Sequence, residues 1–379
     1  MGIALRLVTI AVLRAYAACP GSGNPSPDDE RAPAHLQAEE RMPRYRADML
    51  APPKGLTEDA LAATLSRGWG IEVAGLEYRA VGFGSHHWEV VEAGGARWFV
   101  TVDELSRRRR APNETNSQVQ ARLAAGIGAA RALRNLGERY DFVVAPIPSL
   151  DGAVLIPARE GFCVAVYPLL EGESFRWGEF RYEDQLPAVV AMLVDVHSAP
   201  VRFARGATAD DFGIQMRDEL EQALLDGTEV MDHGPYSIPL GALITHHELA
   251  VHSALHRYDA LVAEIGDETR RVITHGEPHA GNTMFTADGW KLIDWDTAQL
   301  APPERDLWNL DPGDGSVLHQ YAEATGYVPN HDLIELYSLR WDLTDLALCA
   351  REFRGEHGDD ANTAKTWVSV QSVIEALER

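Results

Sequence analysis

The stretch that decides the fold is THGEPHAGNTMFTADGWKLIDWDTA, residues 274–298. Residues 272–274, at its start, and residues 291–294, near its end, have the apolar character of two short strands, and the second strand runs into an acidic turn. A loop and a hairpin would bring Asn282 and Asp294 together. An amide oxygen and a carboxylate are hard ligands suited to Mg²⁺, which completes its coordination with water and phosphate oxygens. The stretch therefore predicts a magnesium site, and on the same loop Glu277 could face a hydroxyl nucleophile.

The chain before this stretch has the pattern of a small antiparallel sheet. Thr57 is followed by two acidic residues and then by apolar residues at helical spacing, which predicts an N-capped helix. Residues 117–136 place apolar side chains on one face and predict a second, packed helix. Strand-like runs bounded by turn residues lie at 76–81, 87–92, 97–102, 142–146, 154–157 and 161–167.

The chain after these strands turns helical. Helices are expected at residues 183–198, 210–226 and 245–265, with loops rich in Gly, Pro and Asp between them. Strands followed by helices favour an α+β fold with two lobes. We expect the junction near residues 168–172, with an N-lobe over residues 49–168 and a mainly helical C-lobe over residues 169–379.

The formal net charge of −23 bears on the kind of partner. A field of this sign repels nucleic acid and anionic membranes and attracts cations, so it favours a small cationic substrate. The alternative is that the charge serves solubility alone. Nothing in the sequence indicates an obligate protein partner.

The cysteines indicate a reducing environment. Cys19, Cys163 and Cys349 are widely separated and form neither a metal-binding cluster nor a disulfide framework. We therefore expect a cytoplasmic location.

The first 48 residues are set apart from the fold. Residues 1–19 have an apolar run that could pass as a secretory signal, but Arg14 interrupts it. Residues 20–46 have the composition of a disordered tail. We interpret the segment as an over-extended reading frame with Met42 or Met49 as the true start, and a targeting segment is the alternative.

Two linked motifs resemble those of a known family. HGEPHAGN at residues 275–282 and LIDWD at residues 292–296 look like the catalytic loop and metal-binding turn of aminoglycoside phosphotransferases and the related choline kinases, which have a protein-kinase-like fold. The matching residues are His275, Gly276, Asn282 and Asp294. The match is specific because two motifs agree in order and spacing.

Further parts of the chain agree with this family. VGFGSHHW at residues 81–88 resembles the turn that covers the nucleotide, and Asp306 resembles the structural carboxylate that follows the metal turn in the sequence. His197 resembles the end of a helix beneath the catalytic loop. The runs WFVTVD and RWDLTDLAL make the chain similar to actinobacterial members labelled spectinomycin phosphotransferase-like.

The resemblance implies an ATP- or GTP-dependent enzyme that uses Mg²⁺ to phosphorylate a hydroxyl of a small, amine-bearing molecule such as an aminoglycoside or aminocyclitol antibiotic. Asn282 and Asp294 would hold Mg²⁺, and Glu277 would position the hydroxyl, with His275 bracing their loop. The implied nucleotide-binding residues are Gly82, Gly84, Ser85, Tyr167 and Leu169, and weaker candidates for substrate contact are Asp296, Trp341 and Asp342.

One departure from the family is the lysine that holds the nucleotide phosphates. It should fall within residues 98–102, where this chain has Thr101 or its neighbours, and only three of its 34 Lys and Arg residues are lysines. Arg97 or Lys291 are candidates to replace it. The glutamate that normally partners this lysine is also missing from residues 117–137.

A second departure is Glu277, which stands where the family has aspartate. The carboxylate is kept, one methylene further out, and could still orient the hydroxyl or accept its proton. Together the departures support an alternative, a catalytically silent kinase-like protein that binds a nucleotide or small ligand.

Other polar residues have ordinary structural explanations. His279 and the pair His86 and His87 are expected to pack rather than to bind metal, since no other His or Cys stands at ligand spacing. Asp342 and Asp345 fall on one face of a helix, where they would line an acidic cleft or belong to a solvated surface.

Overall fold

The structure is a computed structural model that describes residues 51–82, 84–178, 180–204 and 206–378, all within one compact unit of the chain. The predicted extension over residues 1–48 and the residue Phe83 lie outside the described residues, so their interpretation stays a prediction.

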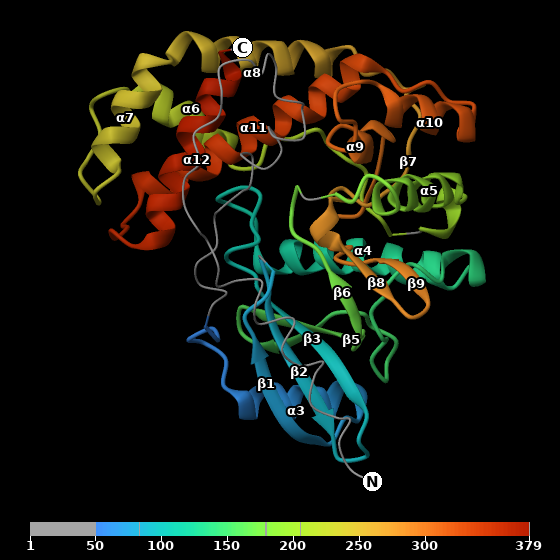
Figure 1. Ribbon diagram of the computed structural model, residues 1–379. Coiled ribbons are helices and arrows are strands. Elements are labelled where there is room, and N and C mark those ends of the chain that lie inside the picture. The colour runs from blue at the N-terminus through green and yellow to red at the C-terminus, as the bar shows by residue number, and fades with distance from the viewer. Residues whose placement is uncertain (1–50, 83, 179, 205, 379) are drawn as a thin grey trace, which may run out of the picture. The chain divides into compact units, whose positions relative to one another are not determined.

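A five-stranded antiparallel sheet forms the N-terminal part, in the order β1-β2-β3-β5-β4 (Figure 1). Its strands are β1 (Val73–Arg79), β2 (His86–Glu92), β3 (Arg97–Glu104), β4 (Ile156–Arg159) and β5 (Phe162–Pro168). The predicted strands at 76–81, 87–92, 97–102, 154–157 and 161–167 are thus confirmed with small shifts at their ends.

Two helices cover the two faces of this sheet. Helix α3 (Glu58–Trp69) begins at the predicted cap, where the Thr57 hydroxyl accepts a hydrogen bond from the Ala60 amide at 3.3 Å. Its apolar face packs against Val100 and Val102 of β3. Helix α4 (Asn116–Arg134) confirms the helix predicted at 117–136 and packs on the other face, against alternate residues of β5.

The segment predicted as a strand at 142–146 is not one. Phe142 and Val144 instead form backbone hydrogen bonds with a single residue of a distant strand, Leu292. The Leu292 amide donates to the Phe142 carbonyl at 2.8 Å, and the Val144 amide donates to the Leu292 carbonyl at 3.1 Å. Pro146 and Pro148 have no N–H group, so no longer ladder forms here. The segment therefore joins the N-terminal part to the hairpin of the acidic turn.

The chain passes from the large sheet to smaller ones between Pro168 and Gly172. Strand β6 (Gly172–Ser174) pairs with β8 (Thr283–Thr286), which forms a hairpin with β9 (Gly289–Leu292). Strand β7 (Val272–Thr274) pairs with β10 (Gln299–Ala301). Strands β7 and β9 confirm the two short strands predicted at the start and near the end of the motif stretch. The loops of the motif connect these short strands.

Helices make up most of the rest of the C-terminal part (Figure 1). They are α5 (Gln185–Ser198), α6 (Arg217–Asp226), α7 (Ser237–His246), α8 (Glu248–Ala263), α9 (Glu304–Leu307), α10 (Ser316–Thr325), α11 (His331–Arg354) and α12 (Ala361–Leu377). Helix α5 shares a core with the motif strands, and α6, α7, α8, α11 and α12 form a second core. No helix within the described part of the chain is long and apolar enough to cross a bilayer.

The helix predicted at 210–226 begins seven residues later, at Arg217. Phe212 (φ 58°) and Met216 (φ 56°) have left-handed backbones, which helices exclude. Asp210 is buried in an ion pair with Arg340, and this contact holds the segment outside any helix.

The single helix predicted at 245–265 is divided between two helices in the structure. The chain breaks at His247, whose φ of −107° and ψ of 19° are not helical, so that α8 begins at Glu248 and a separate α7 precedes it. The His247 side chain lies 2.5 Å from a carboxylate oxygen of Glu378, and this contact holds the corner in place.

Candidate active site

One buried carboxylate holds the loop of the HGEPHAGN motif in place. Asp306, from α9, accepts hydrogen bonds from the backbone amides of His275 at 2.8 Å and Gly276 at 2.6 Å. It also lies 3.0 Å from Nε2 of His197, at the end of α5. Burial alone would raise the pKa of Asp306, but the His197 contact and the nearby Arg305 hold it below the ordinary value. The charged carboxylate therefore positions the start of the loop, as the resemblance implied for Asp306 and His197.

His275 braces the loop from inside. Its Nε2 lies 2.8 Å from the Ile293 carbonyl, and its Nδ1 accepts from the Glu277 amide at 3.2 Å. These contacts require a neutral ring with its proton on Nε2. Burial lowers the pKa of His275 to about 4, which agrees with that assignment.

We expect this neutral histidine to make the fold sensitive to acid. In the unfolded chain His275 takes up a proton near the ordinary pKa of 6.5, whereas in the folded chain it stays neutral until the pH falls to about 4. The stability that is present above pH 6.5 is therefore lost as the pH falls toward 4. Between pH 7.5 and pH 5, His275 alone would lower the free energy of unfolding by about 2 kcal/mol. Denaturant unfolding at both pH values measures the loss. His275→Gln, whose amide can still donate, should lose about 2 kcal/mol less than the parent; an equal loss in both proteins would contradict the assignment.

Glu277 sits on a backbone held at both ends. Its amide donates to His275, and its carbonyl accepts from Nδ2 of Asn282 at 2.8 Å. The side chain is 36% exposed, and one carboxylate oxygen lies 3.9 Å from Nε2 of His279. No Lys or Arg in the described part of the chain forms an ion pair with it. The carboxylate can therefore accept a proton or a hydrogen bond from a ligand in front of the loop.

Asn282 and Asp294 are brought together by the β8–β9 hairpin, as predicted. Thr283 pairs with Leu292 across the hairpin, and the Ile293 amide donates to the Asn282 carbonyl at 2.9 Å. Because the Asn282 side-chain nitrogen is used by Glu277, its amide oxygen is the atom left for a cation. Within the described ranges no group of three or more His, Cys, Asp or Glu could hold a metal. The donor set fits Mg²⁺ held by an amide and a carboxylate, with phosphate oxygens and water completing the shell.

Asp294 has a backbone that residues with side chains rarely adopt. Its φ is 63°, in the left-handed region, and its side chain is exposed. Strained residues of this kind concentrate at functional sites, where the surrounding structure holds them in place. Here α4 is part of that structure: a Cβ on Gly126 would lie 2.6 Å from the carbonyl oxygen of Asp296. Because Gly126 has no side chain, the backbone of α4 can contact the backbone of the turn at Asp296 directly.

The turn predicted to cover the nucleotide joins β1 to β2. Gly82 (φ 68°) and Gly84 (φ 93°) both have left-handed backbones that favour glycine. The Ser85 hydroxyl donates to Asp103 of β3 at 2.8 Å. His87 stacks on Phe99 beneath the turn, and burial lowers its pKa to about 3. The turn is thus backed by the neutral His87 and by Asp103, which holds Ser85.

Tyr167, at the end of β5, lies close to the carboxylates of Asp294 and Asp103. Tyr167 pairs with Phe99 of β3, and burial raises the pKa of its hydroxyl, with the charges of Asp294 and Asp103 adding to the effect. Leu169 follows the strand and is half-buried. The predicted nucleotide-binding residues of the turn and of β5 therefore border the same sheet face as the metal turn.

The predicted substrate residues fall into two groups. Asp296, on the metal turn, forms an ion pair with Arg108, which lies between β3 and α4. Trp341 and Asp342 lie on α11. Arg108 was missed by the sequence reasoning, although the run of four arginines at residues 107–110 in an acidic chain was a visible signal.

The two proposed replacements for the missing lysine are engaged elsewhere. Arg97 pairs with Glu89 and, at 3.1 Å, with Glu171. The Lys291 ammonium donates to the Asp141 carbonyl at 3.1 Å. Glu114, the nearest acidic residue before α4, pairs with Arg122 at 3.0 Å.

A row of aromatic side chains leads away from Glu277. His279 packs edge-on against Trp177 at 4.0 Å between ring centroids, Trp177 stacks on Trp341 at 5.3 Å, and Trp341 contacts Trp308 at 5.6 Å. Nδ1 of His279 and the indole N–H of Trp341 are buried and make no hydrogen bond with any described residue. Unpaired polar atoms on an aromatic surface are suited to a polar ligand. Trp177 and Trp308 gave no sequence signal.

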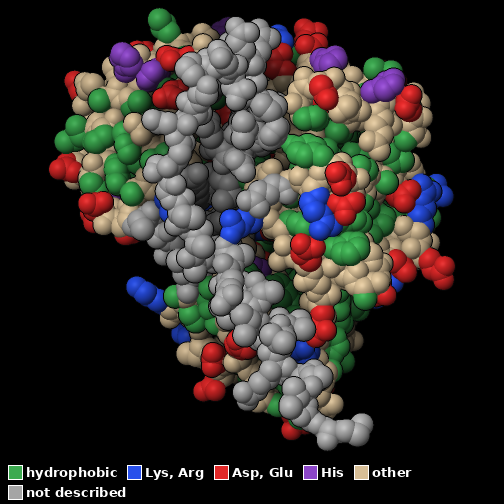
Figure 2. Space-filling view, viewed as in Figure 1, with side chains coloured by type: hydrophobic (Ala, Val, Ile, Leu, Met, Phe, Trp, Pro, Cys, Tyr) green, Lys and Arg blue, Asp and Glu red, His purple; other side chains and the backbone are tan. Residues whose placement is uncertain are grey.

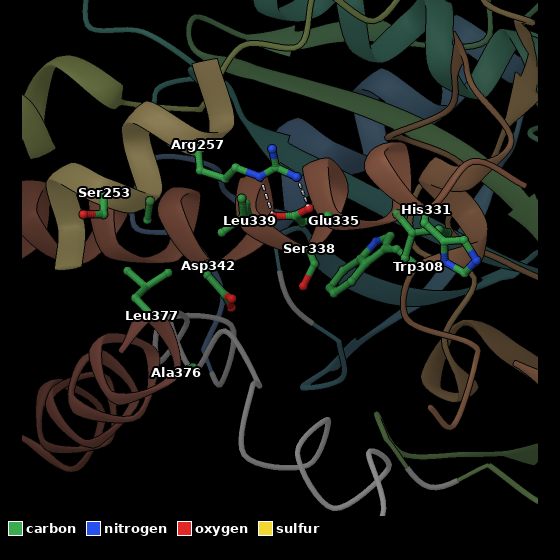
Figure 3. A pocket seen from close by; sticks show the side chains of 12 residues that line it. Ser253, Arg257, Trp308, His331, Glu335, Ser338, Leu339, Asp342, Ala376 and Leu377 are labelled. Carbon is green, nitrogen blue, oxygen red and sulfur yellow. Dashed lines mark hydrogen bonds and ion pairs between the residues drawn. The ribbon is translucent and has the colours of Figure 1, made fainter. Parts of the chain in front are cut away.

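The far end of this row borders a cavity of about 550 Å³ (Figure 3). Its wall includes Trp308, Glu335 and Asp342, and Glu335 accepts two hydrogen bonds from Arg257, the shorter at 2.5 Å. Figure 3 shows Ser338 and Asp342 projecting from the same side of α11, with Trp308 beside them. Asp342 and Asp345 are buried, so the solvated surface considered for them is wrong.

The chain is similar to proteins of one known family. The sequence model of the family described as "Phosphotransferase enzyme family" matches residues 76–337. Protein StrN of Streptomyces griseus is 28% identical over 245 residues, which cover 60% of this chain and 69% of StrN.

Solved structures show the same fold at low identity. Spectinomycin phosphotransferase APH(9)-Ia, in complex with ADP and spectinomycin, aligns with a TM-score of 0.63 at 15% identity and covers 86% of this chain and 98% of its own. Amicoumacin kinase hAmiN, in complex with AMP-PNP, Ca²⁺ and Ami, aligns with a TM-score of 0.57 at 13% identity and covers 85% of this chain and 93% of its own. The predicted protein-kinase-like bilobal α+β fold is confirmed.

Proposed function

The chain belongs to the phosphotransferase enzyme family, and from this premise we propose that it transfers the terminal phosphate of ATP or GTP to a hydroxyl of a small, amine-bearing molecule such as an aminoglycoside or aminocyclitol. The observation that carries the proposal is the loop anchored on Asp306. In this loop the backbone carbonyl of Glu277 accepts a hydrogen bond from Asn282, and the hairpin links Asn282 to the Asp294 turn.

The proposed reaction follows from these positions. The acceptor hydroxyl oxygen bonds to the terminal phosphorus while the bond from that phosphorus to the bridging oxygen breaks, which yields a phosphate ester and a nucleoside diphosphate. Glu277 orients the hydroxyl and takes its proton. Asn282 and Asp294 would hold Mg²⁺, which when bound would neutralise charge on the phosphates. The fixed loop backbone supplies positioning, which is most of what such transfers need.

The nucleotide would lie along the sheet face that carries these residues. Gly82, Gly84 and Ser85 would cover its phosphates, because glycine turns let backbone amides approach them. The backbone from Tyr167 to Leu169 would meet the base, since Pro168 ends the last sheet pairing there. The relatives solved with ADP or AMP-PNP support a nucleotide co-substrate.

The acceptor would lie along the aromatic row, next to His279 and Trp341, whose buried ring nitrogens have no hydrogen-bond partner among the described residues. Aromatic faces attract cations. Acidic side chains are spread over the face shown in Figure 2, in keeping with the net charge of −23. A cationic acceptor would be drawn to such a surface. The solved relative that binds spectinomycin supports this class of acceptor.

Melting temperature and turnover together test the proposal against the silent homologue. ATP or GTP with Mg²⁺ should raise the melting temperature more than either component alone, because a ligand that binds only the folded state stabilises it. Nucleotide consumption over a panel of aminocyclitols and aminoglycosides should then rise with at least one acceptor, and Glu277→Ala should abolish that rise. Stabilisation by nucleotide without acceptor-dependent turnover would favour the silent homologue. No stabilisation by either nucleotide would reject the phosphotransferase and leave only a silent homologue that binds another small ligand.

A further inference from the structure

The sheet face that would meet the nucleotide is acidic. Along β3, Val100 and Val102 pack toward α3, so Asp103 faces the other side, where α4 and the metal turn lie. Asp294 and Asp296 come from that turn, and their charges would repel a nucleotide phosphate in the absence of a cation. Mg²⁺ held by Asp294 would offset part of this charge. A further positive side chain is needed.

Arg108 is placed to supply it. Its Nε lies 3.2 Å from Asp103, its guanidinium also pairs with Asp296, and its side chain is only 11% exposed. Of the ion pairs formed within the described residues, no other involves Asp103 or Asp296. One guanidinium therefore bridges the sheet and the metal turn.

The loop that carries Arg108 is held from two directions. The Arg108 carbonyl accepts from Arg122 of α4 at 2.5 Å, and Glu114 binds both Arg122 and the amide of Arg110. From the C-terminal part, the Met216 amide donates to the Arg110 carbonyl at 2.8 Å. The guanidinium is thus pre-organised, so that little conformational entropy is lost when it contacts a ligand.

Asp103 in turn links Arg108 to the glycine turn. Its Oδ1 accepts from the Ser85 hydroxyl at 2.8 Å and pairs with Nε of Arg108. Asp103 pairs with Nε alone and Asp296 with one Nη, so the planar fork has further donors, and such a fork matches the geometry of a phosphate.

We propose that Arg108 is the phosphate-binding cation of this protein, with Asp103 as its positioning partner. In the nucleotide complex the guanidinium keeps Asp103 and exchanges the Asp296 carboxylate for phosphate oxygens. This inference rests on the proposed nucleotide site and goes beyond it by assigning the charge that a strand lysine does not provide.

The test compares a nucleotide with its nucleoside by calorimetric titration, which requires no turnover. ATP and adenosine, or GTP and guanosine if the parent prefers GTP, share the base and sugar, so only the phosphates separate them. Arg108→Gln should weaken nucleotide binding by roughly 10- to 100-fold, the order of a charged contact, and leave nucleoside affinity within about twofold. Arg107→Gln is the matched control, because Arg107 is adjacent, exposed and paired with Glu104, and it should change neither affinity.

The outcomes separate the inference from the proposed function. If Arg108 only fastens the sheet to the metal turn, Arg108→Gln lowers the melting temperature but leaves the ratio of nucleotide to nucleoside affinity unchanged, and the inference is overturned. If the parent binds no nucleotide, the proposed function fails and the inference with it. Should Arg108→Gln not fold, Arg108→Lys takes its place: it keeps the charge without the fork, so nucleotide affinity should fall several-fold with nucleoside affinity unchanged. An unchanged ratio in that variant would also overturn the inference.

Discussion

Asp294→Asn should weaken binding of Mg²⁺-nucleotide by roughly 10- to 100-fold and remove most of the benefit that Mg²⁺ gives to binding. The carboxylate is the charged member of the Asn282 and Asp294 pair, and loss of a charge-assisted contact costs about 1.5–3 kcal/mol. Asparagine suits the test because it tolerates the left-handed backbone that Asp294 has at φ 63°, so the turn need not rearrange. Titration of the nucleotide with and without Mg²⁺ measures both quantities.

Asp288→Asn provides the control for this change. Asp288 lies at the exposed tip of the same hairpin, so its replacement removes an equal charge without touching the proposed metal site. Its affinity for Mg²⁺-nucleotide should match the parent. If Asp294→Asn binds as tightly as Asp288→Asn, with the same dependence on Mg²⁺, then Asp294 is not a metal ligand.

The parts of the site that the sequence predicted are those built from local contacts. Asn282 and Asp294 stand on either side of one hairpin, so their approach depends on strand periodicity and a short turn. Thr57 and the start of α3 depend on a single capping hydrogen bond between near neighbours. Local rules of this kind can be read directly from residue order.

The errors arose where distant contacts override local preference. Residues 210–216 fall within a predicted helix, yet the buried pair of Asp210 with Arg340, 130 residues away, holds the segment out of a helix. Residues 142–146 read as a strand but meet one residue, Leu292, instead of a full partner strand. The row of Trp177, Trp341 and Trp308 is assembled from three separate segments, and no local rule brings them together.

Gly126 and Arg108 illustrate a third case, in which the signal was present but its meaning required the fold. A glycine inside a helix costs stability relative to alanine, so it calls for a reason, and that reason is the carbonyl of Asp296 against which the helix packs. A run of arginines in an acidic chain likewise calls for a reason. The structure supplies the two carboxylates that surround Arg108.

The replacement of Glu277 by alanine should reduce turnover by roughly 10²- to 10⁴-fold, the usual contribution of a positioned acid or base, and leave nucleotide affinity nearly unchanged. The structure supports this separation, because the backbone of Glu277 is held by His275 and Asn282 and does not depend on its side chain. Single-turnover kinetics with saturating nucleotide measures the chemical step. A loss of nucleotide affinity as large as the loss of rate would show instead that the loop had collapsed.

The exchange Glu277→Asp asks whether the longer side chain is an adaptation. His279 lies 3.9 Å from the Glu277 carboxylate and leads to the aromatic row where the acceptor would bind, so the acceptor hydroxyl should lie at the reach of a glutamate. Shortening the side chain by one methylene would withdraw the carboxylate by about 1 Å, and an error of that size can cost about 100-fold in rate. Glu277→Asp should therefore be slower than the parent while binding nucleotide and acceptor with similar affinity. A Glu277→Asp protein that turns over faster than the parent would mean that the pocket was built for aspartate, and that Glu277 marks a site losing its activity rather than one shaped around a different acceptor.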